Sequence, residues 1–146
     1  MKSSYSQLMQ TQYFHPAFNS AIYDGPIRIY FAQFHESLAL KIYFLCQQKL
    51  APLLVQAKEV SKKTGATCLL LLYPSVEFFD QTFPQVESSL NKVAVENFEQ
   101  DLLIGLRGPL EDVELEKLLE ILQNQIDGWI KNHRSQMSQF EATELR

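Results

Sequence analysis

A run of six apolar residues constrains the fold of this chain more than any other feature. Cys68 to Tyr73 reads CLLLLY, and Pro74 follows it. A strand with one face in water alternates apolar and polar side chains, whereas this run contains no polar member. The run is also far too short to span a bilayer. It therefore predicts a central strand over residues 67–73 that is covered on both faces.

Two further segments have the composition of strands. Residues 27–34 begin with the β-branched and aromatic stretch IRIYFA directly after the turn sequence Asp24-Gly25-Pro26. Residues 101–106 read DLLIGL, in which Gly105 indicates a bulge or a close contact. Helical patterns separate the three strands. This alternation predicts an α/β fold with a small sheet of three or more mostly parallel strands flanked by helices.

Helices are predicted at about 36–63, 76–97 and 112–131. In the first, Leu38, Ile42 and Leu45 recur at helical spacing, and Leu40 and Phe44 widen the apolar surface. A helix that is apolar on all sides is usually well buried. We therefore expect this helix to be enclosed by the rest of the domain.

Two details of the helices stay open at the level of sequence. Pro52 either kinks the first helix or begins a second one in its first turn. Val86, Leu90 and Val93 fit the second helix, but residues 92–98 also fit a strand paired with the next one. We take the helix as the prediction there.

The third helix has the clearest amphipathic pattern in the chain. Its apolar stripe consists of Leu115, Leu118, Leu119, Leu122, Ile126, Trp129 and Ile130. Gly128 falls on the opposite side, where solvent is expected. A stripe this narrow packs against one surface, which is either the sheet or a twin helix of a second copy.

The 146 residues suffice for one domain with a substantial core. Residues 1–24 are polar but rich in aromatics, so we expect an irregular arm that docks on the domain or on a second copy. Residues 25–134 form a single α/β domain, and residues 135–146 a polar tail. The first residues show no secretory signal, which predicts a cytoplasmic protein. Cys46 and Cys68 are expected to be buried free thiols.

Charge is unevenly distributed along the chain. Residues 1–75 carry a net charge of +4 and residues 76–146 a net charge of −8. A nucleic-acid surface needs a clustered basic face, which this distribution does not favour. We expect neither nucleic acid nor a membrane as partner. The segregation favours a charged protein partner or contact between copies of the chain.

One candidate ligand site follows from the predicted topology. In open α/β sheets, ligands bind beyond the carboxyl ends of the strands. His35, Glu36, Ser37, Ser75 and Arg107 lie at these ends. If the strands are parallel, the five residues share one rim, where helix N-termini attract anions. Each also has a structural role open to it, such as capping for the serines.

Specific catalytic signatures are missing from the sequence. His35 could act as general base for a Ser75 nucleophile, but neither serine lies in a Gly-x-Ser-x-Gly elbow. The three histidines are scattered without metal-ligand spacing. The chain also lacks the glycine-rich fingerprints of nucleotide binding. We expect no metal and no cofactor, and an enzyme is the less favoured class.

Phe78, Phe79 and Phe83 cluster near Pro84. Such a cluster either packs in the core or forms an exposed apolar patch for a partner. Together with the aromatic arm and the segregated charge, it favours a non-enzymatic adaptor or regulatory domain that acts through protein contacts and forms a homodimer. The alternative is a domain, catalytic or not, that binds a small molecule or anion at the rim.

Overall fold

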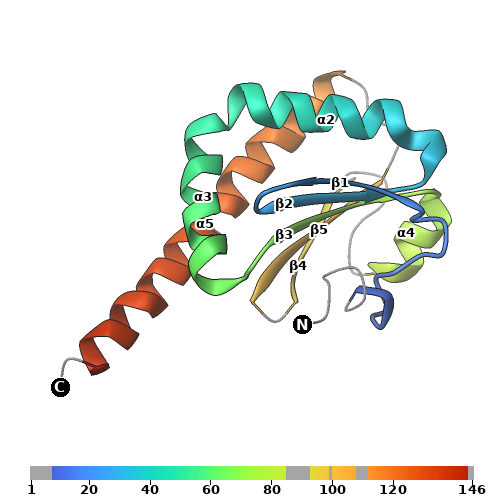
Figure 1. The fold of residues 1–146 in the computed structure, drawn as a ribbon. Coiled ribbons are helices and arrows are strands. Elements are labelled where there is room, and N and C mark those ends of the chain that lie inside the picture. The colour runs from blue at the N-terminus through green and yellow to red at the C-terminus, as the bar shows by residue number, and fades with distance from the viewer. Residues whose placement is uncertain (1–7, 85–92, 99, 108–111, 145–146) are drawn as a thin grey trace.

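The computed structural model describes residues 8–84, 93–98, 100–107 and 112–144. It is an α/β fold built on a five-stranded mixed sheet with the order β1-β2-β3-β5-β4, with helices on both faces (Figure 1). The strands are β1 (Ser20–Asp24), β2 (Ile27–Phe31), β3 (Cys68–Tyr73), β4 (Val93–Phe98) and β5 (Asp101–Arg107).

The three predicted strands form the parallel centre of the sheet. β3 lies between β2 and β5 and pairs with both in parallel, so that Leu70 is opposite Ile29 on one side and Ile104 on the other. All six side chains of β3 are buried. The continuous apolar run therefore has the role that its composition predicts, a central strand covered on both faces.

Antiparallel strands complete the sheet at both edges. The sequence did not predict the first, and the second was the alternative left open at residues 92–98. β1 pairs with β2 across a turn in which Gly25 has a φ of 57°, so residues 20–24 are not irregular. β4 pairs with β5. The helix expected over 76–97 is wrong for residues 93–97, and its residues 85–92 lie outside the described part of the chain. Only two residues separate β4 from β5, and this short connection favours a hairpin over a helix ending there.

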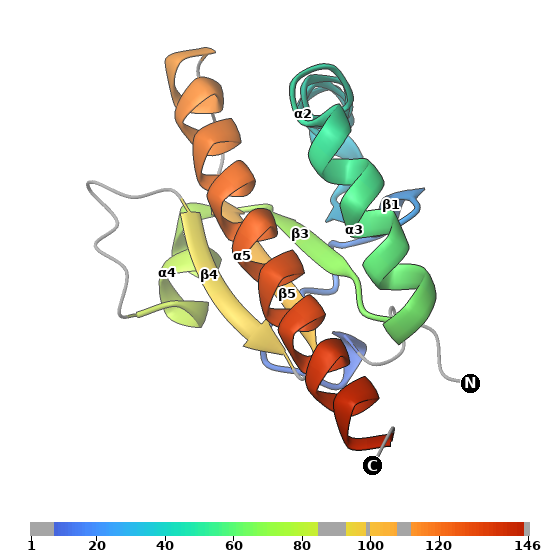
Figure 2. The same cartoon turned by 90° about the vertical axis from the view of Figure 1, so that its left-hand side faces the viewer.

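One face of the sheet carries three helices, α2 (Glu36–Lys49), α3 (Ala51–Thr64) and α5 (Asp112–Glu144). Figure 2 shows α3 and α5 running side by side. Pro52 lies in the first turn of α3, where its missing N–H has no helical partner to lose. The segment Gln33–Lys49 meets α3 at 98°. Two helices rather than one kinked helix thus connect β2 to β3.

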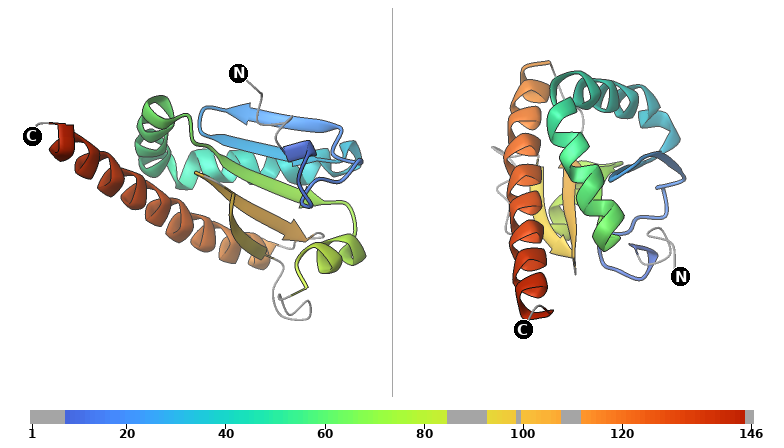
Figure 3. Two further views of the ribbon diagram at one scale, coloured as in Figure 1. Left: turned by 90° about the horizontal axis from the view of Figure 1, so that it is seen from below. Right: turned by 60° about the vertical axis from the view of Figure 1, so that its left-hand side comes forward.

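Every residue of the predicted stripe on α5 is buried in the core beneath these helices. The stripe packs against the sheet and α3, and Gly128 faces open space as predicted. The helix continues through the region expected to be a polar tail and ends at Glu144, so that its last turns project beyond the sheet (Figure 3). No glycine or proline follows Gly128, and polar helix formers such as Gln and Glu sustain a helix without a core.

The opposite face is covered by the short helix α4 (Val76–Thr82) and by residues 8–19, which approach it from the N-terminal side. Its core is aromatic and includes Phe18, Tyr30 and Tyr73. A short 3-10 turn, η1 (Gln33–His35), leads from β2 into α2. Among the described residues no single helix is long and apolar enough to cross a membrane, although the bent pair of Gln33–Lys49 with α3 meets the same test when taken together.

Candidate functional site

The parallel centre brings the five predicted rim residues to one edge of the sheet. Ser75 caps α4, because its hydroxyl oxygen accepts a hydrogen bond from the Phe78 N–H at 3.2 Å. This local role is the one expected of a serine before a helix. Glu36 and Ser37 are exposed in the first turn of α2. These three residues have the structural roles that their positions allow.

His35 and Arg107 differ from the other rim residues. The His35 Nδ1 and the Arg107 Nε are both buried, and neither has a hydrogen-bond partner among the described residues. Burial lowers the pKa of His35, which favours the neutral imidazole. In the part of the chain that is described, no hydrogen bond or ion pair joins His35, Ser75 and Arg107. The Ser75 hydroxyl is engaged by the helix, so a nucleophile–base pair is not assembled.

The aromatic cluster around α4 lies mainly inside the protein. Phe79 and Phe83 are completely buried, and Phe78 is half-buried against the Tyr73 and His15 rings. Phe79 and Phe83 therefore contribute to the core and do not form an exposed patch. Of the three side chains predicted to contact a partner, Phe79 and Phe83 are thus enclosed by the domain.

Three exposed large apolar side chains lie instead on the segment from η1 to α2. Phe34 is 71% exposed, Phe44 60% and Leu40 38%. Leu40 and Phe44 are one turn apart, so they share the outer face of α2. The expectation that α2 is enclosed on all sides is wrong for this face. Ile42 and Cys46 are buried beneath the helix, but no described element covers its outer side. We call Phe34, Leu40 and Phe44 the α2 patch.

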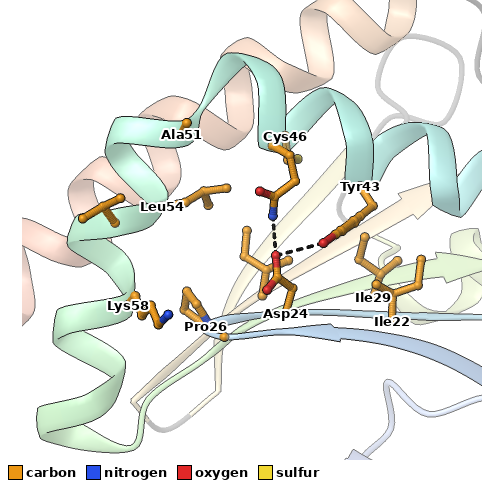
Figure 4. Close-up of a pocket in the computed structure, with 13 residues that line it drawn as sticks. Ile22, Asp24, Pro26, Ile29, Tyr43, Cys46, Ala51, Leu54 and Lys58 are labelled. Atoms are coloured by element: carbon orange, nitrogen blue, oxygen red, sulfur yellow. Dashed lines mark hydrogen bonds between the residues drawn. The ribbon is translucent and has the colours of Figure 1, made fainter.

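A pocket of about 240 Å³ lies between the β1–β2 turn and the bend from α2 to α3. Ile22, Ile27, Ile29, Cys46 and Leu54 give it an apolar interior. Asp24, Tyr43, Gln47 and Lys58 supply polar groups (Figure 4). Because β2 begins at this end, the pocket lies at the amino ends of the parallel strands, opposite the predicted rim.

Side chains of α2 hold Asp24 in a fixed orientation. The Tyr43 hydroxyl donates to Asp24 Oδ2 at 3.1 Å, and the Gln47 Nε2 amide donates to the same oxygen. Partial burial and the neighbouring Asp24 carboxylate raise the pKa of Tyr43, so the phenol keeps its proton and remains a donor. Burial likewise raises the pKa of Cys46 to about 12, which keeps this thiol of the pocket wall protonated and unreactive.

The sequence contained only part of the signal for this pocket. Asp24-Gly25-Pro26 is recognisable as a turn, but nothing in its local pattern places it beside Tyr43 or Lys58, which are 19 and 34 residues further on. The pocket exists because β1 adds a hairpin at the sheet edge and α2 bends into α3 above it.

No protein-family model, curated protein or solved structure matches the chain. Within the described residues no group of three or more His, Cys, Asp or Glu side chains is arranged to hold a metal ion. The features that carry a functional argument are therefore the α2 patch, the rim and the pocket.

Proposed function

We propose that the chain is a non-enzymatic adaptor or regulatory domain that acts through protein contacts, and that it self-associates through the α2 patch. The observation that carries the proposal is the outer face of α2. The large apolar side chains of a helix in a globular domain usually face its core, yet Phe44 and Leu40 are exposed. Aromatic residues are enriched in protein interfaces and often dominate their binding energy.

Charge complementarity supports a second copy as the partner. α2 and α3 together carry five lysines and two glutamates, whereas α5 carries seven acidic and three basic side chains. The three helices lie on the same side of the sheet. In a two-fold dimer, the basic helices of each copy can face the acidic helix of the other, which makes the contact self-complementary.

Sedimentation velocity of the full chain over a range of concentrations tests this proposal. We expect a dimer that dissociates when Leu40 and Phe44 are both replaced by Ser. Met9, which is 50% exposed on the opposite side of the domain, supplies the control variant Met9→Ser, which should dimerise like the wild type. A wild-type chain that stays monomeric at millimolar concentration would overturn the proposal.

Charge reversal tests whether the partner is a second copy in the proposed orientation. Lys49→Glu reverses an exposed charge on the basic helix α2, and Glu120→Lys reverses an exposed charge on the acidic helix α5. Each single variant should weaken dimerisation, and salt should weaken it in the wild type. An equimolar mixture of the two variants should associate more strongly than either variant alone. Equal association of all samples would exclude this charge pairing.

A second candidate function is anion binding at the rim. The Arg107 Nε, which has no hydrogen-bond partner among the described residues, favours it. A guanidinium with a free N–H can bind a phosphate oxygen. Titration with inorganic phosphate, followed by amide NMR shifts, should perturb the residues around Arg107 in the wild type and not in the Arg107→Gln variant. Identical titrations of both proteins would remove this candidate.

A further inference from the structure

The pocket beside the first hairpin combines an apolar interior with two opposite charges. It is distinct from the α2 patch, since Phe34, Leu40 and Phe44 do not line it, although the Phe44 ring contacts that of Tyr43, which does. An apolar cavity of about 150 Å³ is large enough to bind benzene. At about 240 Å³, this pocket has room for a ring or branched aliphatic group and a few further atoms. Its lining is that of a small-ligand site, mostly apolar with a few placed polar groups.

Asp24 offers one carboxylate oxygen to a ligand. Both of its described hydrogen bonds, from Tyr43 and Gln47, go to Oδ2. Oδ1 has no hydrogen-bond or ion-pair partner among the described residues. The two donors from α2 fix the rotation of the side chain, so the free oxygen has a defined direction before any ligand arrives. Such preorganisation lowers the entropic cost of binding.

Lys58 supplies the opposite charge from a different wall. Its stem lies over the β1–β2 turn, 3.9 Å from the position that a Cβ on Gly25 would occupy. Figure 4 shows the side chain extending from α3 towards this turn, next to which Asp24 lies at the end of β1. Lys58 forms no ion pair with Asp24 or with any other described residue. The pocket lining therefore holds a carboxylate and an ammonium group that form no ion pair with each other.

We propose that this pocket binds a free α-amino acid with a large apolar side chain. Its ammonium group contacts Asp24 Oδ1, its carboxylate contacts Lys58, and its side chain enters the space lined by Ile22, Ile29 and Leu54. A zwitterion satisfies both charges at once. A simple amine leaves Lys58 without a partner, and a simple carboxylate leaves Asp24 without one. Charge-assisted hydrogen bonds are the strong ones in such a site.

Titration of the ¹⁵N-labelled full chain with L-phenylalanine tests the proposal. Shifts should be confined to the β1–β2 turn and to α2 and α3 around the pocket, with a Kd of about 1 mM or tighter. Phenethylamine lacks the carboxylate and 3-phenylpropanoate lacks the ammonium, so each should bind at least about tenfold more weakly. No saturable shift with L-phenylalanine would overturn the proposal. Equal binding of either single-charge analogue would also overturn it.

Matched variants identify the charges that act. Asp24→Asn and Lys58→Met should each weaken L-phenylalanine binding by about tenfold or more. Lys62→Met removes an exposed lysine one turn further along α3, outside the pocket lining, and should bind like the wild type. If Asp24→Asn fails to fold, Ala51→Phe obstructs the pocket from an exposed position and should abolish the shifts. Retained binding in the Ala51→Phe variant would contradict the assignment.

The double variant Leu40→Ser/Phe44→Ser separates this inference from the proposed self-association. It should lose dimerisation and keep the amino-acid titration, because neither residue lines the pocket. Loss of both properties in a folded double variant would contradict independent sites.

Discussion

The two faces of the sheet are built in different ways from the same three central strands. On one face, Leu70 and Ile104 meet long helices whose leucines repeat at regular spacing. On the other, Leu71 and Leu103 meet aromatic rings contributed by a short helix and by residues 8–19. Regular helices cover a face with many aliphatic contacts, whereas short irregular segments do so with a few large rings, each burying much more area.

The polar ends of these rings distinguish the aromatic face further. Tyr73 reaches out of the sheet, and its hydroxyl donates to the Tyr13 carbonyl at 2.8 Å. Tyr13 in turn stacks on Phe83 at 5.7 Å between centroids. Both packing and a hydrogen bond therefore hold the N-terminal segment on the sheet.

The proposed self-association surface and the proposed amino-acid site both lie on the helical side, where the outer surface of α2 and its bend into α3 stay accessible.

Removing one ring from the N-terminal segment tests whether it belongs to the core, and this is the largest effect we predict. Phe18 is 1% exposed and packs on Tyr73 at 5.3 Å between centroids. Phe18→Ala should lower the free energy of unfolding by about 3–5 kcal/mol. Urea denaturation measures it, with the fluorescence of Trp129 on the opposite face as the probe. Met9→Ala, at an exposed position of the same segment, should change stability by no more than about 0.5 kcal/mol.

A loss below about 1 kcal/mol for Phe18→Ala would mean that the N-terminal segment only rests on the sheet. The core of the aromatic face would then depend on α4 alone, and residues 8–19 would not be part of it.

At Gly105, the aromatic face leaves no space for a side chain. A Cβ there would lie 2.6 Å from Phe83 Cε2 and 3.1 Å from Tyr73 Cε2. Gly105→Ala should therefore cost about 1–3 kcal/mol through overpacking, measured by the same denaturation. Phe83→Leu in the Gly105→Ala background should recover part of the loss, because the two sites are in contact.

Gly128 is the control for this substitution on the helical side. Nothing lies within 4 Å of the position of its Cβ, and it is exposed on α5. Gly128→Ala should stabilise the protein by about 0.5–1 kcal/mol, since alanine is the better helix former. If both alanine variants changed stability in the same direction, the space around Gly105 would not be the cause.

The two faces should also respond to different ranges of alkaline pH. Cys46 and Cys68 belong to the helical face, and burial raises the pKa of both thiols, that of Cys46 to about 12. Tyr30 and Tyr73 belong to the aromatic face, and burial raises the pKa of both phenols. In every case the unfolded chain loses the proton first. Stability is therefore complete below the unfolded pKa and falls as the pH rises above it.

Each thiol should lower the free energy of unfolding by about 1.4 kcal/mol per pH unit above pH ~8.5. The phenols should lower it further only above pH ~10. Chemical denaturation between pH 7 and pH 10 measures the slope. Cys46→Ala should flatten it by the share of one thiol, whereas Tyr73→Phe should leave the slope below pH ~10 unchanged. A slope that the Cys46→Ala variant leaves unaltered would contradict burial of this thiol as its source.

These contrasts also explain how much the sequence could predict. Local patterns encode the α5 stripe from Leu115 to Ile130, through its helical periodicity, and the strand over 67–73, through its unbroken apolar run, so both were predicted correctly. The edge strands are encoded by pairing with a neighbour. Residues 93–98 contain a helix-like spacing as well as β-branched residues, and the hairpin to β5 decides between them. The length of α5 was underestimated because a polar helix end resembles a tail.

The candidate sites show the same limit. Parallel strands were predicted, so the sharing of one edge by His35, Ser75 and Arg107 followed from topology. A hydrogen bond between His35 and Ser75 did not follow, because the Ser75 hydroxyl caps α4 instead. The pocket around Asp24 and Lys58 depends on an unpredicted hairpin and on a helix bend that the sequence left open, and such long-range placement has no local pattern.

The smallest predicted effects concern one hydrogen bond on each face. The Tyr13 carbonyl accepts the Tyr73 hydroxyl on the aromatic face. On the helical face, the Gln100 carbonyl is paired with two side chains, Trp129 Nε1 and His133 Nε2, each at 3.0 Å. Tyr73→Phe should lower the free energy of unfolding by about 1 kcal/mol, because it removes the described partner of the Tyr13 carbonyl.

His133→Phe keeps a ring beside Trp129 and leaves the indole N–H in place. It should therefore lower the free energy of unfolding by no more than about 0.5 kcal/mol. Urea denaturation of the two single variants at pH 7 compares them directly. Equal losses of unfolding free energy would show that the remaining Trp129 donor does not compensate for the loss of His133. The two carbonyls would then depend equally on the side chain that each variant removes.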